Sequence, residues 1–462
     1  MVAPVGAQTN FYTLLTNGPA SNRLNIVLFA EGYTTNELPG LFLSDATNAL
    51  NDFLAYQPYQ EYQNYCNMFA IAVPSKQKGS THLEGGGHFV ANATYFNSTY
   101  DVDYNYIITI PPYNVDTSAS DGIGKANALL KFFGLATNQS LAVILVNEPY
   151  ADGGSGGPIA ISSTDINLEP EIIVHESGHT LGLLADEYTN GYADLKLNTA
   201  VLANFTQTTN QQTIKWNAWI PSGTPIPTEE TDNQYTGVVG LFRGANYSTS
   251  DYRPALYCLM NNLIDPFVGG PQAFCPVCCE AMVEAIYKRA RPVDSFTPAT
   301  NATVLITNTR AVPFELTLLQ PETHDLDVQW YTNGAPVPGG TNATYSLVPL
   351  SFTNGTYSVK ALVNDPTPFV RTDPSNLLSA SLVWTVKISV GILTIDSARW
   401  LPSGKFSFRL SGEAPNGFVI QSSTDLANWL SLSTNNLAAG QYYYTNSALA
   451  GTSCKFYRAL LR

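Results

Sequence analysis

The sequence is poor in charged residues, and basic residues are scarcer than acidic ones. Asp, Glu, Lys and Arg make up only 13% of the 462 residues, about half the usual share in soluble proteins. The formal net charge is −14, and no basic run occurs. Nucleic acids and anionic membranes attract clustered Lys and Arg, so neither is an expected partner. Asn, Thr, Ser, Gly and Tyr take the polar positions instead, as in many extracellular β-rich proteins.

Long apolar runs are also missing. No stretch approaches the roughly 18 apolar residues of a transmembrane helix, so no membrane span is expected. The first residues, MVAPVGAQTNFYTLL, carry no positive charge ahead of an apolar core and are not a signal peptide as they stand. A mature start with an added Met1 fits equally well. The expectation of export therefore comes from other features.

Cysteine is infrequent, and four of the six cysteines fall between positions 258 and 279. Cys275-Pro276-Val277-Cys278 has the spacing of half a structural zinc site, but neither a second pair nor a nearby His supplies the other ligands. A disulfide from Cys258 to Cys275 or Cys278 is the favoured interpretation, and it would fit an oxidising compartment. Adjacent Cys279 leaves the pairing open. The remaining cysteines are Cys66 and Cys454.

Residues 1–293 are predicted to form one α/β domain. Short apolar runs alternate with segments of helical periodicity, which is typical of a parallel or mixed sheet covered by helices. The expected strands are 24–30, 69–73, 106–110 and 141–146, and the expected helices are 38–56 and 126–133.

After residue 294 the helical periodicity disappears, and two all-β modules are predicted at 294–390 and 391–462. In the first, Trp330 lies in a strand that runs into Asn333-Gly334, a strong hairpin signal, and Tyr357 enters a later strand. This layout resembles bacterial Ig-like sandwiches without their disulfide. The second contains 419–426 and Trp429, and resembles a C-terminal β repeat of secreted bacterial proteins. Their one histidine, His324, has no catalytic partners in sequence, so both are interpreted as presentation or adhesion units.

The motif that carries chemistry is His175-Glu176-Ser177-Gly178-His179, which fits HExxH. On a helix, positions i and i+4 lie on one face, so both imidazoles can reach one metal ion. Glu176 lies beside that face and can serve as general base. Apolar neighbours give the helix a buried side, and Pro170 falls at its first turn, where proline is tolerated.

A hydrolytic zinc site takes three protein ligands and keeps a position for water. Gly182 can end or bend the helix, so that the following residues turn back towards the metal. The metzincin pattern places the third ligand at position 185, which is Ala here and cannot ligate. Asp186 is the favoured third ligand, and Glu187 or a distant side chain is the alternative.

Other residues have weaker claims to the site. Met260 is a candidate for the methionine turn that metzincins place beneath the metal, although a plain core role is equally compatible. Residues 156–163 are interpreted as an exposed edge strand that could pair with an extended substrate. Tyr188, Tyr192 and Tyr257 could each stabilise an oxyanion, and His82 and His88 are expected to be solvated loop residues.

These residues together resemble the M64 family of metallopeptidases, whose founding activity is cleavage of immunoglobulin A. The similarity follows the family's order across roughly residues 20 to 290, in the segments 28–34, 67–71, 73–76, 145–147, 153–157, 175–188, 258–260 and 274–278. The resemblance implies an exported, metzincin-like zinc endopeptidase. Its ligands would be His175, His179 and Asp186, and its base Glu176.

The sequence therefore predicts a secreted or cell-surface bacterial enzyme that hydrolyses peptide bonds with Zn²⁺. The alternative is an adhesin or glycan-binding protein on a non-catalytic peptidase-like scaffold, and a zinc hydrolase of a non-peptide bond is a third possibility. The expected partner is a protein or peptide substrate. Further protein or glycan contacts are expected through the C-terminal modules.

Overall fold

The structure is a computed structural model in which the chain divides into two compact units. Unit 1 comprises residues 1–292, 319–326 and 364–380, and unit 2 comprises 293–318, 327–363 and 381–462. The residues described are 9–84, 88–100, 108–110, 122–148, 153–155, 158–164, 169–189, 200–231, 233–263, 272–414, 416–437, 440–446 and 455–462.

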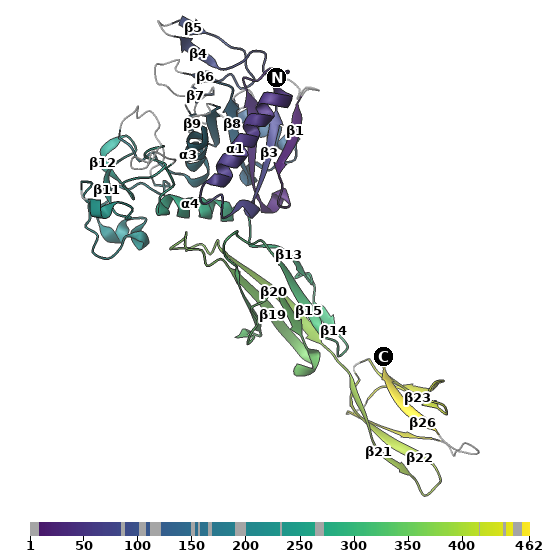
Figure 1. Cartoon of the computed structure of the whole chain (residues 1–462). Helices are drawn as coiled ribbons and strands as arrows, with labels where there is room; N and C mark the ends of the chain where they lie inside the picture. Colours follow the sequence, from purple (N-terminus) through teal and green to yellow (C-terminus); the bar gives the residue numbers. More distant parts are fainter. Residues whose placement is uncertain are drawn as a thin grey trace. The chain divides into compact units, whose positions relative to one another are not determined.

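A six-stranded mixed sheet forms the centre of unit 1 (Figure 1). The inner strands β3, β2, β8 and β10 are parallel, and the edge strands β1 and β9 are antiparallel to their neighbours. Strands β2 and β3 are buried along their whole length, as expected for parallel strands covered on both faces. In sheet order the strands are β1 (Asn10–Leu15), β3 (Cys66–Ala72), β2 (Leu24–Glu31), β8 (Ser140–Val146), β10 (Ile159–Ser163) and β9 (Gly153–Ser155).

The sequence predicts an exposed edge strand at 156–163, and this prediction is wrong for β10, the strand that forms there. Strand β10 is buried throughout, because β8 pairs with one side of it and β9 with the other. The edge of the sheet is instead β9, which is three residues long. Residues 156 and 157 lie outside the described part of the chain.

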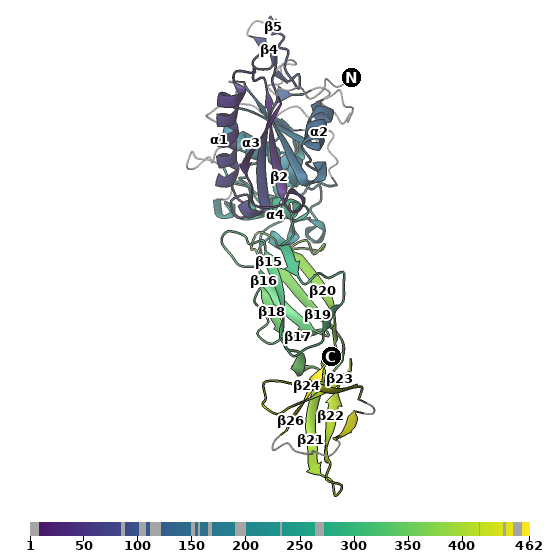
Figure 2. The ribbon, with the colours of Figure 1, turned by 90° about the vertical axis from the view of Figure 1, so that its right-hand side faces the viewer.

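The described part of the chain has four α-helices: α1 (Leu43–Ala55), α2 (Gly122–Phe132), α3 (Glu169–Gly182) and α4 (Pro276–Tyr287). Figure 2 shows α1 and α2 on opposite faces of the sheet. A π-helical turn, Leu38–Phe42, leads into α1. Helix α3 packs on β8, β9 and β10 and against both α1 and α4. It is therefore held from several sides by elements that are distant in sequence.

Two smaller sheets complete unit 1. One has the order β5-β4-β6-β7 and carries the two histidines expected in a solvated loop, His82 on β4 and exposed His88 on β5. The other is the hairpin β11-β12. Their strands are β4 (Thr81–Glu84), β5 (His88–Val90), β6 (Thr99–Tyr100), β7 (Ile108–Thr109), β11 (Phe242–Ala245) and β12 (Ser248–Arg253).

A buried carboxylate at the end of β2 organises the loop after β5. Glu31 is fully buried. Its Oε1 accepts hydrogen bonds from the Thr94 hydroxyl at 2.5 Å and the Ser98 amide at 2.8 Å, and its Oε2 accepts from the Phe96 amide at 2.8 Å. Backbone donors that would otherwise be buried unpaired are thereby satisfied by a single side chain.

Among the described residues, the regular elements of unit 2 are β-strands and one short 3-10 helix, Pro349–Ser351. Its first two sheets have the orders β13-β15-β18 and β14-β20-β19-β16-β17. An aromatic core joins them. The ring centroid of Phe314 on β15 lies 5.3 Å from that of Trp384 on β20, and Trp384 stacks on Trp330 of β16 with 5.6 Å between ring centroids. The strands are β13 (Val293–Thr297), β14 (Val304–Ile306), β15 (Val312–Leu318), β16 (Asp327–Thr332), β17 (Ala335–Pro336), β18 (Thr344–Leu347), β19 (Gly355–Asn364) and β20 (Ser379–Ile388).

The remaining strands of unit 2 form two three-stranded sheets, β21-β22-β25 and β24-β23-β26. A separate small core lies among Phe408, Leu410, Phe418 and Ile420. The strands are β21 (Ile392–Trp400), β22 (Phe406–Glu413), β23 (Phe418–Ser423), β24 (Leu430–Asn435), β25 (Gln441–Thr445) and β26 (Phe456–Leu461). In the described part of the chain, no helix combines the length and apolarity that crossing a membrane requires.

Glu31→Ala is expected to destabilise unit 1 by about 3 kcal/mol, because three buried donors lose their acceptor. Urea denaturation followed by helical circular dichroism measures this, since all four described α-helices lie in unit 1. Exposed Glu229 provides the control, and its replacement by Ala should change stability by less than about 0.5 kcal/mol. Equal stability of the two variants would contradict the anchoring role of Glu31.

Candidate active site

Helix α3 carries both histidines of the motif on its buried side. His175 and Glu176 are buried, and His179 is partly buried. Ile173, Val174 and Leu181 secure the helix in the core. The apolar pattern that predicts this helix thus also fixes the direction in which the two imidazoles project.

The chain reverses direction immediately after α3, although not by the predicted means. Leu183, and not Gly182, adopts the left-handed backbone conformation, with φ of +51°. Gly182 is required for a different reason, because a Cβ there would lie 2.6 Å from the Met282 sulfur on α4. The reversal is stabilised by hydrogen bonds from the Leu184 amide to the Gly178 carbonyl and from the Ala203 amide to the Leu183 carbonyl.

This reversal brings Asp186 against both histidines. Asp186 Oδ1 lies 3.2 Å from His175 Nε2 and 3.3 Å from His179 Nε2, and the two Nε2 atoms are 3.1 Å apart. Asp186 is buried. Three potential metal ligands therefore lie close enough together to bind one ion. Two of them come from α3, and the third comes from the segment that follows it.

Backbone carbonyls fix the orientation of each imidazole. The Leu259 carbonyl lies 3.0 Å from His175 Nδ1, and the Leu184 carbonyl lies 2.7 Å from His179 Nδ1. A carbonyl only accepts, so each Nδ1 carries the proton and donates it. In the neutral rings each Nε2 then has a lone pair directed at the shared point, which is the tautomer that a metal ligand needs.

The second oxygen of Asp186 is held by the β11-β12 hairpin. Tyr247 donates its hydroxyl to Asp186 Oδ2 at 2.5 Å, and the Asn246 amide donates to the Asp186 carbonyl at 2.8 Å. Both turn residues have positive φ. Burial and the nearby Asp186 raise the pKa of Tyr247 well above its ordinary value, so the phenol keeps its proton and remains a donor.

The electrostatics of the three residues favour a cation between them. Burial alone would lower the pKa of His175, but its contact with Asp186 and the negative charges of Asp186 and Glu176 together outweigh burial, so the pKa is raised. Burial would likewise raise the pKa of Asp186, but His179 and His175 hold it well below the ordinary range. The site therefore stabilises added positive charge, which a proton or a metal ion can supply.

The neighbouring Glu187, the alternative third ligand, points elsewhere. Its Oε1 accepts a hydrogen bond from Asn204 Nδ2 at 2.9 Å and lies 3.3 Å from Cys278 Sγ. Asn204 also bonds both the amide and the carbonyl of Ala185, at 2.7 and 2.9 Å. Burial raises the pKa of Glu187 well above its ordinary value. Asn204 thus fixes the segment that carries both acids, with their side chains directed to different places.

Met260 packs against α3, the helix that carries the HExxH motif. It is fully buried, and a Cβ on Gly178 would lie 2.9 Å from its sulfur. The Glu187 amide donates to the Met260 carbonyl at 2.7 Å, which ties this turn to the segment after α3. The placement is compatible with both interpretations of Met260 from the sequence, a methionine turn and a plain core role.

The other sequence candidates fall in different places. Tyr188 contacts Tyr247 through their hydroxyls at 3.3 Å, so it lies beside the site. Tyr257 is half-buried one residue before Cys258, and Tyr192 lies outside the described residues. The favoured disulfide is not formed. Cys258, Cys275 and Cys278 are free, with 3.7 Å between the sulfurs of Cys258 and Cys278.

Sequence reasoning missed Tyr247 and Asn204. Asn204 follows the end of α3 at Gly182 by 22 positions and Tyr247 follows it by 65, and neither belongs to a recognisable motif. The turn 246–247 has positive φ at two residues that are not glycine, so the usual signal for such a turn is absent.

Comparisons with known proteins address the N-terminal half of the chain. Residues 12–237 match the family model IgA Peptidase M64. No curated protein matches the sequence. The solved structures that resemble the chain include a quinonprotein alcohol dehydrogenase-like protein from Bacteroides thetaiotaomicron, at 12% identity and a TM-score of 0.15, over 31% of this chain and 39% of that one.

Two further structures are similarly distant. The fibronectin(III)-like modules of Clostridium thermocellum CbhA are 9% identical, with a TM-score of 0.15 over 33% of this chain and 78% of theirs. A cytokine receptor complex is 12% identical, with a TM-score of 0.18 over 36% of this chain and 88% of that one. Scores this low establish no shared fold. This chain spans 39% of the first of these structures.

Gly178→Ala is expected to destabilise unit 1 by about 1–2 kcal/mol. The new methyl group would lie 2.9 Å from the Met260 sulfur and 3.2 Å from carbons of Leu184 and Phe274, and this overpacking exceeds the gain in helix propensity. Thermal unfolding of the pair Gly178→Ala and Gly40→Ala measures the effect, because nothing lies within 4 Å of a Cβ at Gly40. A Gly178 variant at least as stable as the wild type would show that α3 and Met260 are not closely packed.

Proposed function

The chain belongs to the IgA peptidase M64 family through residues 12–237, and from this premise we propose that it is a secreted zinc endopeptidase acting on a protein substrate. The family match supports peptidase activity. The observation that carries the proposal is the convergence of His175 Nε2, His179 Nε2 and Asp186 Oδ1 within 3.3 Å of one another.

The three donors fit a zinc ion in both distance and chemistry. Zinc binds imidazole nitrogen and carboxylate oxygen at about 2.0–2.2 Å, so two such ligands of a tetrahedral site are about 3.3–3.5 Å apart. The observed separations are 3.1, 3.2 and 3.3 Å. In the described part of the chain, no hydrogen bond reaches the buried Asp186 Oδ1. A carboxylate oxygen in that position needs a cation to offset the cost of its burial.

When bound, zinc supplies a Lewis acid for the scissile carbonyl and acidifies water at the remaining position. The residues of the chain supply the rest. Glu176, buried on α3 next to His175, accepts the proton of the attacking water and passes it to the leaving amine. Tyr247 holds Asp186 through Oδ2 and leaves Oδ1 facing the histidines.

Space for substrate lies beside the segment that follows Asp186. A cavity of about 450 Å³ opens there, lined by Glu187, Tyr188, Thr189, Glu230, Arg243, Arg253, Asn261 and Asn262. Its wall is mainly polar, and Arg253 pairs with Glu230 at 3.4 Å. His175, Glu176, His179 and Asp186 do not line it, so we propose that it receives a polar part of the substrate at some distance from the scissile bond.

Secretion and the use of unit 2 are part of the same proposal. The low content of charged residues and the β-rich unit 2 support an extracellular setting. We propose that the β modules in unit 2 present the enzyme to extracellular proteins or glycans. The chain would then combine a hydrolytic unit with a separate contact unit.

Glu176→Gln should lower peptide hydrolysis about 10²- to 10⁴-fold, because the amide cannot accept the proton. Zinc content should stay unchanged, since Glu176 is not one of the converging ligands. The measurement is cleavage of a panel of native and denatured proteins, with new N-termini identified by mass spectrometry and zinc determined by elemental analysis on the same samples.

Glu171→Gln is the matched control, because Glu171 is a second buried carboxylate of α3 and lies one residue before Ile172, outside the histidine motif. It should retain wild-type hydrolysis. An adhesin would give a different pattern, with no cleavage by wild type or either variant and equal binding by all three. That result, with zinc present, would overturn the enzymatic proposal and leave the metal site standing.

A further inference from the structure

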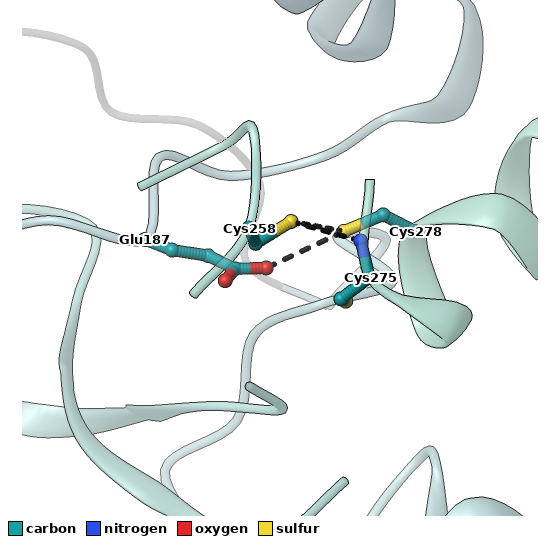
Figure 3. A group of neighbouring side chains, drawn as sticks. All are labelled: Glu187, Cys258, Cys275 and Cys278. Carbon is teal, nitrogen blue, oxygen red and sulfur yellow. Dashed lines mark hydrogen bonds between the residues drawn. The ribbon is translucent and has the colours of Figure 1, made fainter. Parts of the chain in front are cut away.

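A second cluster of potential metal ligands lies on the other side of the segment that carries Asp186. Glu187, Cys258, Cys275 and Cys278 are all buried, and one ligand atom from each lies within 4.8 Å of all the others. Figure 3 shows the four side chains grouped together from three parts of the chain. We propose that they bind a structural zinc ion, distinct from the ion held by the two histidines.

The distances match a tetrahedral site with three sulfur ligands. Zinc–sulfur bonds are about 2.3 Å long, so two thiolates of one site are about 3.8 Å apart and a thiolate and a carboxylate oxygen about 3.6 Å apart. The sulfurs of Cys258 and Cys278 are 3.7 Å apart, and Cys278 Sγ lies 3.3 Å from Glu187 Oε1. The Cys275-to-Cys278 spacing places both sulfurs at the start of α4, a common arrangement in structural zinc sites.

Glu187 supplies the independent indication that a cation belongs here. The side chain is fully buried, and within the described residues no hydrogen bond reaches its Oε2. A buried carboxylate among three thiols is costly unless a cation or further donors compensate. Zinc displaces thiol protons on binding and takes thiolate as a ligand.

The ligand set also answers the objection that the sequence raised against a zinc site. The sequence offers only one CxxC pair, and the two missing ligands come from Glu187 and Cys258, which are 71 residues apart in the numbering. Soft sulfur ligands favour zinc over magnesium or calcium, which prefer oxygen. A site closed by four protein ligands leaves no position for water, so its role is structural.

Such an ion would connect the three segments that support the active site. Glu187 follows Asp186 directly, Cys258 precedes Met260 by two residues, and α4 packs against α3. One tetrahedral centre would therefore fix the position of the third active-site ligand and of the turn beneath the helix. Asp186 needs this support because it lies on an irregular segment and not on a helix or strand.

Cobalt substitution separates the two sites, because only the cysteine cluster offers sulfur. The full-length chain loaded with Co²⁺ should show sulfur-to-cobalt charge-transfer absorption. This signal should persist in His175→Ala and be lost in Cys278→Ser. Cys279→Ser is the matched control, since Cys279 is adjacent and buried but lies outside the cluster, with its sulfur near the Phe274 carbonyl. Its signal should equal that of the wild type.

Zinc content gives the stoichiometry. Wild type and Cys279→Ser should hold about two zinc ions per chain, and His175→Ala and Cys278→Ser about one each. If Cys278→Ser does not fold, wild type alone suffices: its three cluster thiols should resist a thiol reagent until a chelator is added. Failure of the peptidase proposal would leave the cobalt signal unchanged, because that signal does not depend on hydrolysis.

Two results would overturn the second site. One is wild-type protein that takes up Co²⁺ without any sulfur charge-transfer band. The other is a disulfide between two of the three cysteines, shown by peptide mapping of the oxidised chain, with a zinc content that Cys278→Ser does not change.

Discussion

The candidate active site depends on three potential metal-ligand atoms, each with a lone pair, being held close together inside the protein. His175 Nε2, His179 Nε2 and Asp186 Oδ1 lie 3.1–3.3 Å apart, and the backbone carbonyls at Nδ1 leave each neutral imidazole with its lone pair facing the others. Without a cation this arrangement is repulsive, and low local polarity strengthens the repulsion. The surrounding contacts are those that such a site needs: Tyr247 on Asp186, Asn204 on the following segment, and Met260 under α3.

The segment 185–188 is the point at which several constraints meet. Asn204 fixes Ala185, Tyr247 fixes Asp186, the Met260 carbonyl receives the Glu187 amide, and Glu187 points into the cysteine cluster. Successive side chains thus point to different centres. This alternation explains how two adjacent acids can serve separate purposes, and why sequence alone left Asp186 and Glu187 as competing ligands.

Local sequence patterns predicted the helices, strands and turns that neighbouring residues determine. The apolar runs at 24–30 and 141–146 became β2 and β8, the 38–56 periodicity became a π-turn and α1, and Asn333-Gly334 forms the turn between β16 and β17 with both residues at positive φ. The helix that carries HExxH could be predicted for the same reason. Pairing between distant segments could not be predicted. Strand β9, which has no strong sequence pattern, pairs with β10, and Glu187 lies beside cysteines that are 71 or more positions away. The Leu183 reversal was missed because it uses a residue that rarely adopts positive φ.

Anomalous diffraction from crystals of the full-length chain, recorded on both sides of the zinc absorption edge, tests the central claim most directly. The account predicts a zinc peak about 2 Å from each of His175 Nε2, His179 Nε2 and Asp186 Oδ1. A crystal soaked in zinc that shows ordered histidines at this point, with no peak between them, would contradict it.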